Sequence, residues 1–254
     1  MTHEIDFHIR GNGQPTVFIH SLGLDHKLWD FCIEELSATS KTLSYDLPGH
    51  GNNPPPSHSY EIKNLSNDLV ESLKRHGIVK ANFVGLSIGG MIAQHLAANN
   101  PEIVEKLVLI DTTPTYSEEW KKNWAERASI ARTRGVEVMR EKLLEAFFTT
   151  DFLTQDSAEI EYCRSAINSI SAEGYALACE ALALGEMEKY APLIVANTLI
   201  MCGDQDNILF KEAVHWFNEN IQNTKVEWLS PAQHVSPLEC QKDFIMHLKK
   251  FLEL

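Results

Sequence analysis

Apolar runs and stretches of helical periodicity alternate along most of this chain. The runs are short, rich in β-branched residues and in several cases continuously apolar, as in strands that are buried on both faces of a parallel sheet. They occupy residues 16–20, 42–46, 82–86, 106–111, 198–202 and 225–229. Apolar residues recur with helical spacing in residues 26–38, 60–76, 88–99, 210–220 and 237–252. This alternation predicts an α/β fold, with a mostly parallel central sheet, helices on both of its faces, and an antiparallel edge strand at residues 4–10.

One long segment interrupts the alternation. From residue 115 to about residue 190 the sequence has helical periodicity and no convincing strand. Ser117 followed by two glutamates is typical of a helix N-cap, and Gly135 marks a boundary between two helices. We therefore predict a core domain formed by residues 1–114 and 191–254, and a helical insertion at 115–190 that lies as a lid over one end of the sheet. The alternative is a packing extension with no role in catalysis.

Composition and charge restrict the class of protein. The chain has 254 residues, enough for one large domain, and its formal net charge of −13 disfavours nucleic acid and anionic membranes as partners. Its five cysteines are widely spaced and form no CxxC motif, which favours free thiols in a reducing compartment. The first residues lack the basic and apolar regions of a signal peptide, and no apolar run has the roughly 20 residues needed to span a bilayer. We expect a soluble cytoplasmic protein, and its oligomeric state stays open.

Ser87 is the first candidate for chemistry. It lies in Gly85-Leu86-Ser87-Ile88-Gly89-Gly90, directly after an apolar run and before a helical stretch. A strand that turns at once into a helix strains the backbone at the turn, and the residues two positions away must be small because the two backbones crowd there. This is the G-x-S-x-G pattern of a nucleophile elbow, which places the serine hydroxyl at the N-terminus of a helix. Ser87 is therefore predicted to be a nucleophile.

A serine hydroxyl needs a base to take its proton, and the base needs a carboxylate to orient it. Among eleven histidines, His234 follows the last predicted strand, where a loop can carry it over the carboxyl end of the sheet. The carboxylate is expected after the preceding strand, in LIMCGDQDNILF, and this segment offers both Asp204 and Asp206.

With the chain order Ser87, Asp206 and His234, the sequence resembles the α/β-hydrolase-fold enzymes over essentially its whole length. In that family the acid is usually the aspartate three residues after the glycine of a G-x-x-D turn. The resemblance therefore favours Asp206 over Asp204. It also implies that no metal or organic cofactor takes part.

Two further segments carry the same resemblance. The segment FIHSLGLDHKLWD matches the oxyanion loop of the family, which implies that the backbone N–H of Leu22 and that of Ile88, the residue after the nucleophile, form the oxyanion hole. YDLPGHG matches the loop after the family's fourth strand, which implies that His50 is a structural turn residue.

The oxyanion loop also distinguishes between subgroups. Ser21 stands where most of the family has glycine, and the resulting Ser-Leu-Gly resembles the loop of 3-oxoadipate enol-lactone hydrolases, as do residues 85–114 and 234–244. Carbon–carbon bond hydrolases of this fold generally have Gly-Pro in the loop and a tryptophan soon after the histidine, and both are missing. Dehalogenases and epoxide hydrolases have aspartate in place of Ser87. The resemblance implies a serine hydrolase that cleaves a small carboxylic ester or lactone through an acyl-enzyme. The alternatives are a carbon–carbon bond hydrolase or other non-ester reaction, and a slow-turnover ligand receptor.

Residues of the insertion are candidates for the substrate pocket. Five aromatic residues suit either an apolar pocket wall or the protein core, and they are Trp120, Trp124, Phe147, Phe148 and Phe152. A substrate that bears a carboxylate would need a cation. Five arginines on these acidic helices suit either that role or surface ion pairs, and they are Arg127, Arg132, Arg134, Arg140 and Arg164.

Overall fold

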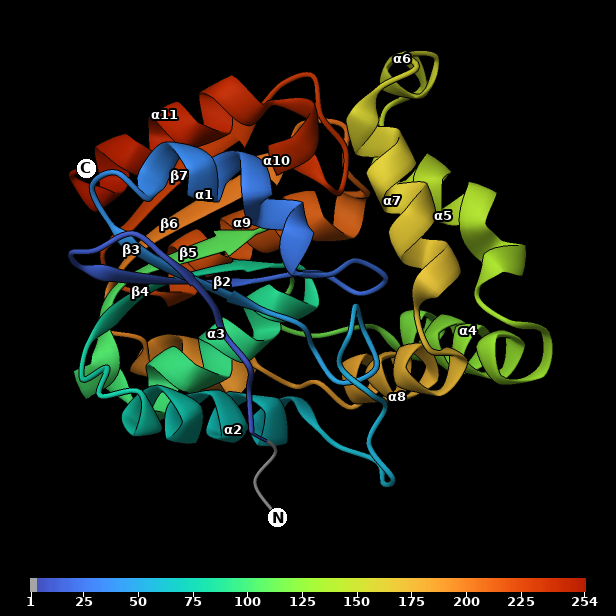
Figure 1. The fold of residues 1–254 in the computed structure, drawn as a ribbon, viewed down its shortest axis with the longest axis horizontal. Coiled ribbons are helices and arrows are strands. Elements are labelled where there is room, and N and C mark those ends of the chain that lie inside the picture. The colour runs from blue at the N-terminus through green and yellow to red at the C-terminus, as the bar shows by residue number, and fades with distance from the viewer. Residues whose placement is uncertain (1–3) are drawn as a thin grey trace.

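The computed structural model describes residues 4–254, and a seven-stranded sheet forms its centre (Figure 1). The strand order is β1-β3-β2-β4-β5-β6-β7. Among the described strands, only β1 (His8–Arg10), which pairs with β3, is antiparallel to its neighbour. The parallel strands are β2 (Pro15–Ile19), β3 (Lys41–Tyr45), β4 (Ala81–Leu86), β5 (Val104–Ile110), β6 (Asn197–Gly203) and β7 (Thr224–Leu229). The predicted α/β fold with a mostly parallel sheet and an antiparallel edge strand is confirmed.

Helices cover both faces of the sheet. On one face lie α1 (Asp30–Leu36) and α11 (Gln241–Leu252), and on the other lie α2 (Ile62–Arg75) and α3 (Ile88–Asn99) (Figure 1). A further helix, α9 (Ile208–Asn220), packs against β6 and β7. Because both faces are covered, β4 is buried along its whole length, which explains its continuously apolar sequence.

The prediction of one helix at 237–252 is wrong in one respect. The segment forms α10 (Ser236–Glu239) and then α11, because Cys240 leaves the helical backbone region with φ −118° and ψ 47°. Side-chain periodicity continues across this residue, so the sequence does not reveal the break.

Between β5 and β6 the described chain forms helices and no strand. The α-helices are α4 (Glu118–Arg134), α5 (Arg140–Phe147), α6 (Thr150–Leu153), α7 (Ala158–Ser169) and α8 (Ala172–Ala183). These helices stand beyond the carboxyl ends of the strands, on the right in Figure 1. The Ser117 side chain caps α4 by accepting a hydrogen bond from the N–H of Trp120, and α4 ends at Gly135, as predicted.

The helical insertion is also packed against the core. Gly174, near the start of α8, lies so close to Gly49 in the loop after β3 that a Cβ on either residue would overlap with the other's main chain. The N–H of Ser171 donates to the carbonyl oxygen of Gly49 at 3.1 Å. Side chains are excluded at this contact, so the two backbones meet directly.

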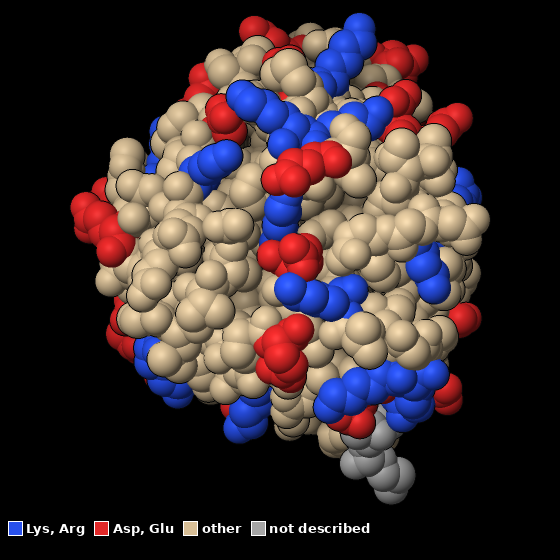
Figure 2. Space-filling view, turned by 90° about the vertical axis from the view of Figure 1, so that its left-hand side faces the viewer, with Lys and Arg blue, Asp and Glu red and all other residues tan. Residues whose placement is uncertain are grey.

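The surface away from the insertion carries charges of both signs. On the face away from the insertion, basic and acidic side chains lie close to one another (Figure 2). The five cysteines are free, as predicted, and all but Cys240 are buried. Within residues 4–254, every helix is too short or too polar to cross a bilayer.

Candidate active site

Ser87 lies at the turn between β4 and α3. Its backbone angles are φ 55° and ψ −114°, in a region that residues other than glycine rarely adopt. A Cβ on Gly85 would overlap with the carbonyl oxygen of Gly89, and a Cβ on Gly89 would overlap with that of Ile19. The main chain of the turn is fixed because Ser87 N–H donates to Ile110 O at 2.9 Å and Thr112 Oγ1 donates to Ser87 O at 2.7 Å. The strained turn is therefore held by the end of β5 and the first residues of the loop that follows it.

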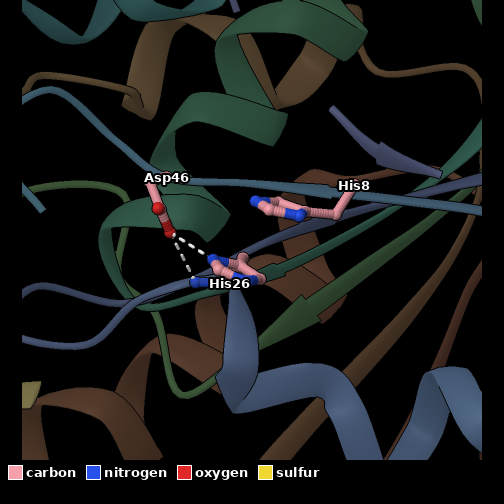
Figure 3. A group of neighbouring side chains, drawn as sticks. All are labelled: His8, His26 and Asp46. Carbon is pink, nitrogen blue, oxygen red and sulfur yellow. Dashed lines mark hydrogen bonds and ion pairs between the residues drawn. The ribbon is translucent and has the colours of Figure 1, made fainter. Parts of the chain in front are cut away.

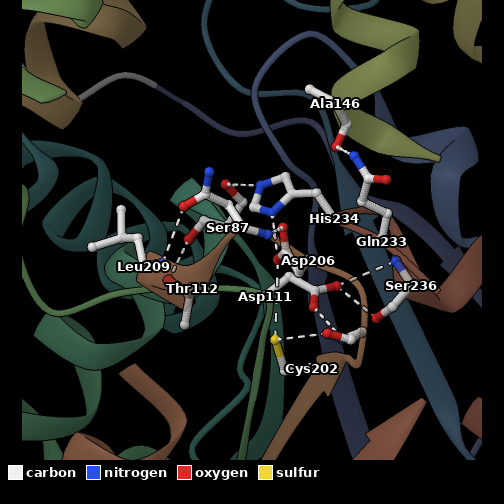
Figure 4. Close-up of polar contacts among 12 residues, drawn as sticks. Ser87, Asp111, Thr112, Ala146, Cys202, Asp206, Leu209, Gln233, His234 and Ser236 are labelled. Atoms are coloured by element: carbon white, nitrogen blue, oxygen red, sulfur yellow. Dashed lines mark hydrogen bonds and ion pairs between the residues drawn. The ribbon is translucent and has the colours of Figure 1, made fainter. Parts of the chain in front are cut away.

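The structure brings His234 and Asp206 together with Ser87 (Figure 4). His234 Nε2 lies 3.1 Å from Ser87 Oγ, and His234 Nδ1 lies 2.9 Å from Asp206 Oδ2. The Asp206 carboxylate accepts the proton of Nδ1, which leaves Nε2 as the acceptor for the serine hydroxyl. Burial lowers the pKa of His234, but the charge of Asp206 and the hydrogen bond to it outweigh burial, and the pKa is raised. These three side chains can transfer a proton from serine to histidine.

Asp204 lies on the same turn but points elsewhere. Its carboxylate accepts hydrogen bonds from Ser230 Oγ at 2.7 Å and from the N–H of Ala232 at 3.1 Å, and the residue is exposed. Of the two aspartates, Asp206 is the one in contact with the imidazole.

The loop after β2 carries Leu22 to the same place. Leu22 and Ser87 line one cavity, and Ile88 begins α3, where the first N–H groups have no acceptor within the helix. His20 fixes this loop, since its Nδ1 lies 2.8 Å from Ser21 O and its Nε2 accepts the N–H of Leu47 at 2.8 Å. Burial lowers the pKa of His20, which keeps its ring neutral.

His50 lies in the neighbouring turn and is fully buried. Its Nδ1 is 3.2 Å from the carbonyl oxygen of Pro48, and burial lowers the pKa of His50 to about 3. A neutral, buried ring in a tight turn agrees with the structural role expected from the sequence.

A cavity of about 390 Å³ lies between the elbow and the helical insertion. Trp120, Trp124 and Phe147 line it, whereas Phe148 and Phe152 stack on each other with ring centroids 5.1 Å apart and are not part of its wall. Sequence reasoning missed two further aromatic residues of the wall, Tyr175 on α8 and Phe210 on α9. Phe210 lies four residues after Asp206, at the start of the helix that follows β6. Its closeness in sequence to the candidate acid is a signal that could have identified it. Tyr175 has no comparable signal.

Arg127 is the one of the five candidate arginines that lines the cavity. Its guanidinium lies 4.9 Å from the ring centroid of Trp124, and no carboxylate within residues 4–254 is paired with it. Trp124 Nε1 is buried in the same wall and has no acceptor in the described part of the chain. Among the described residues, the cavity wall therefore contains a guanidinium without a carboxylate partner, beside a tryptophan whose buried N–H has no acceptor.

The other four arginines lie outside the cavity. Arg132 pairs with Glu173 and Glu180, Arg140 pairs with Glu141, Arg164 pairs with Glu161, and Arg134 is exposed. For three of them the surface ion pair is the role that the structure supports.

The loop that carries His234 is bonded to the insertion. Val235 N–H donates to Phe147 O at 3.0 Å, and Gln233 Nε2 donates to Ala146 O at 3.1 Å (Figure 4). Both acceptors are backbone carbonyls at the end of α5. The histidine is thus held between β7 and the helices above the cavity.

A separate group of possible metal ligands consists of His8, His26 and Asp46 (Figure 3). Asp46 Oδ1 accepts from both the N–H and the Nδ1 of His26, each at 2.8 Å, and this hydrogen bond raises the pKa of His26. The rings of His8 and His26 stack, with centroids 3.7 Å apart and planes 9° apart. The lone pairs of two stacked rings lie in parallel planes and do not converge on one ion. This group therefore fixes the turn at His26.

The amino-acid sequence matches a known protein family and curated proteins. Residues 14–239 match the family described as alpha/beta hydrolase fold. A 3-oxoadipate enol-lactonase of Acinetobacter baylyi is 28% identical over 228 residues, covering 90% of this chain and 84% of that protein. A pimeloyl-(acyl-carrier protein) methyl ester esterase of Chromobacterium violaceum is 28% identical over 255 residues, covering 96% of each.

A solved structure agrees with these sequence matches. The enol-lactonase from Burkholderia xenovorans superimposes with a TM-score of 0.91 at 28% identity, covering 98% of this chain and 96% of that one. Since the sequence match spans most of the chain and the main chain follows the same course, this protein belongs to the α/β hydrolase fold family.

Proposed function

We propose that this protein hydrolyses a small carboxylic ester or lactone through an acyl-enzyme on Ser87. The observation that carries the proposal is the continuous contact from Ser87 Oγ through His234 to Asp206, at 3.1 and 2.9 Å, on the wall of a cavity. The relatives named above as lactonases and a methyl ester esterase support a carboxylic ester bond as the one that is broken.

In the proposed reaction, Ser87 Oγ attacks the carbonyl carbon while His234 Nε2 takes the serine proton. The carbonyl oxygen becomes an oxyanion, which accepts hydrogen bonds from the N–H groups of Leu22 and Ile88. His234 then gives its proton to the leaving alkoxide, and an acyl-enzyme remains. Water attacks the acyl carbon, His234 takes a proton from that water, and the proton returns to Ser87 as the carboxylic acid leaves. Asp206 orients the imidazole and stabilises its protonated form in both halves.

Residues 115–190 act as a lid in this proposal. In an open α/β sheet the reactive groups lie beyond the carboxyl ends of the strands, and the helical insertion stands there. Its side chains supply much of the cavity wall, including Trp120, Trp124 and Phe147. A roof of bulky aromatic groups over a cavity of about 390 Å³ favours compact substrates and keeps bulk water away from the acylation step.

We therefore expect short acyl esters and lactones to be hydrolysed faster than long-chain ones. Across a series of 4-nitrophenyl esters, kcat/KM should fall by about tenfold or more between a short and a long acyl chain, as when a pocket excludes extra methylene groups. Trp120→Ala enlarges the cavity and should reduce this preference.

Phe152→Ala is the matched control, because Phe152 is an aromatic residue of the insertion that does not line the cavity. It should keep the selectivity of the wild type. A wild-type preference for long chains, or equal changes in both variants, would contradict the role given to residues 115–190.

The substrate in this proposal also bears a carboxylate. Arg127 is an unpaired cation in the cavity wall, and the buried Nε1 of Trp124 is a second donor next to it. A carboxylate that accepts hydrogen bonds from both would pair with a guanidinium that has no carboxylate partner among residues 4–254 and with an indole N–H that has no acceptor there.

Arg127→Gln should raise KM for a carboxylated ester and leave that for its neutral counterpart unchanged. Monomethyl glutarate and methyl valerate form a suitable pair, since they have similar length and differ in the terminal carboxylate. For the first, kcat/KM should fall by about tenfold or more, the loss expected for a hydrogen bond to a charged group. Arg134→Gln, an exposed arginine on the same helix, serves as the control. Equal losses on both esters would show that Arg127 does not recognise a carboxylate.

A further inference from the structure

A second buried carboxyl group lies behind the contact between His234 and Asp206. Asp111 is the first residue after β5, is 1% exposed, and adopts φ 43°. That angle is in the left-handed region, where aspartate is tolerated at a cost in free energy. Its main-chain N–H is held by Met201 O at 3.0 Å on the neighbouring strand. The strained backbone directs the side chain toward the two loops that follow β6 and β7.

The two carboxyl oxygens of Asp111 are bonded to different loops (Figure 4). Oδ1 accepts the N–H of Gly203 at 2.8 Å, and Gly203 is the last residue of β6, where the turn to Asp206 begins. Oδ2 accepts both the N–H of Ser236 at 3.2 Å and the Ser236 hydroxyl at 2.6 Å. Ser236 begins α10, directly after the loop of His234. One carboxyl group therefore connects the segment of Asp206 with the segment of His234.

The surroundings of Asp111 contain no compensating cation among the described residues. Its carboxyl lies within 4.8 Å of the Asp206 carboxyl and of Cys202 Sγ, both on or after β6. His234 and, more remotely, Cys240 are the other titratable groups that face it. Burial raises the pKa of Asp111 to about 7, and the charge of Asp206 adds to this effect. The three hydrogen-bond donors are what stabilise its charged form.

We propose that Asp111 is a positioning residue that holds the Asp206 turn and the His234 loop at the separation the reaction requires. The inference rests on the proposed function, since it gives Asp111 a role in positioning two of the three side chains that carry the proposed reaction. Asp111 itself touches neither Ser87 nor the cavity. It acts through the segments that carry the acid and the base, and its charge adds to the field that favours protonated His234.

Asp111→Asn tests this with little change of shape. The amide oxygen can accept hydrogen bonds on one side only, and the amide NH₂ then meets an N–H donor on the other, so one of the two loops is released. We expect kcat to fall on the order of 10²-fold, as for a small misplacement of reacting groups. KM should stay within about twofold, because substrate binding is not altered.

The pH profile separates positioning from general loss of structure. His234 must be neutral to accept the serine proton, so activity falls as pH drops through its pKa. Asp111 is charged above its own raised pKa of about 7, and its charge stabilises protonated His234, so replacement by the neutral asparagine lowers the pKa of His234. The acidic limb of kcat/KM should therefore move to lower pH. Partial unfolding would only lower the amount of active enzyme, which titration with a fluorophosphonate measures.

Two further variants keep the test decisive. Ser236→Ala removes one donor to the same carboxyl group, and we expect a smaller loss in kcat and an acidic limb moved in the same direction. The double variant should lose no more than Asp111→Asn alone, because both changes act on one contact. Asp204→Asn is the control, since Asp204 joins the same turn and loop at the exposed surface through Ser230 and Ala232.

A measurement without turnover completes the design. The proton between His234 Nδ1 and Asp206 should give a low-field NMR resonance, and Asp111→Asn should shift the pH at which it titrates. A variant with the wild-type kcat, pH profile and resonance would overturn the inference. So would a lower kcat with an unmoved acidic limb and an unchanged resonance. If a fluorophosphonate fails to label wild-type Ser87, the proposed function fails, and the resonance still tests the inference about Asp111.

Discussion

Replacement of Ser87 by alanine should abolish ester hydrolysis and leave the fold intact. We expect kcat to fall on the order of 10⁶-fold, the effect of removing a triad serine. The loss is large because, within residues 4–254, Ser87 supplies the hydroxyl in contact with His234 Nε2. The fold should survive, since the main chain of the turn is held by Ile110 O and by the Thr112 hydroxyl, and neither bond uses the Ser87 side chain. The measurement is steady-state hydrolysis of a short 4-nitrophenyl ester, with Tm as the check of folding.

A fluorophosphonate should label the wild type at Ser87 alone, located by mass mapping of the peptides. Ser57→Ala removes an exposed hydroxyl far from the contact with His234 and is the matched control, with full labelling and full turnover expected. Normal turnover by Ser87→Ala, or an adduct on another residue, would exclude Ser87 as the nucleophile. Tight binding of a lactone without turnover by the wild type would favour the ligand-receptor alternative.

Replacement of Asp206 by asparagine should lower kcat on the order of 10⁴-fold, as loss of the correct histidine tautomer does in such a triad. Asparagine presents an amide to His234 Nδ1 and no longer stabilises the protonated ring. Because the charge of Asp206 raises the pKa of His234, the residual activity should also extend to lower pH. Both effects are read from a pH series of kcat/KM.

Asp204→Asn is the matched control for this variant. Asp204 lies on the same turn, but its carboxylate is exposed and bonded to Ser230 and Ala232. Its loss should change kcat by less than about tenfold. Equal losses in the two variants, or a larger loss at Asp204, would assign the acid to Asp204.

The central sheet is well predicted from the sequence because strands that are buried on both faces consist almost entirely of apolar residues. The run at 82–86 is continuously apolar, and β4 is buried at each of its residues. Features that depend on the backbone conformation of single residues produce no pattern of apolar residues. The break at Cys240 and the contact between Gly49 and Gly174 are both of this kind. The first looks like an uninterrupted helix, and the second joins two glycines that no side-chain pattern relates.

Some residues of the candidate site are likewise identifiable from the sequence, and others are not. Ser87 and His234 are recognisable because their chemistry requires a particular position after a strand. Asp204 and Asp206 share that position, so the residues alone leave both open, and the direction of each side chain separates them. Arg127 could not be distinguished from four other arginines, since which face of a helix meets a cavity depends on how helices pack. An aspartate directly after an apolar run is common, so the sequence does not single out Asp111. Its hydrogen bonds to Gly203 and Ser236, on two different loops, are visible only in the structure.

The bonds between the His234 loop and the insertion have a consequence for how this protein can diverge. Val235 and Gln233 donate to the carbonyl oxygens of Phe147 and Ala146, which are main-chain groups. Any amino acid at those positions offers the same carbonyl. Substitutions along α5 can therefore reshape the cavity while the loop of His234 keeps its hydrogen bonds. Selection for a new substrate can act on the insertion's side chains without first having to rebuild the proposed Ser87, His234 and Asp206 site beneath them.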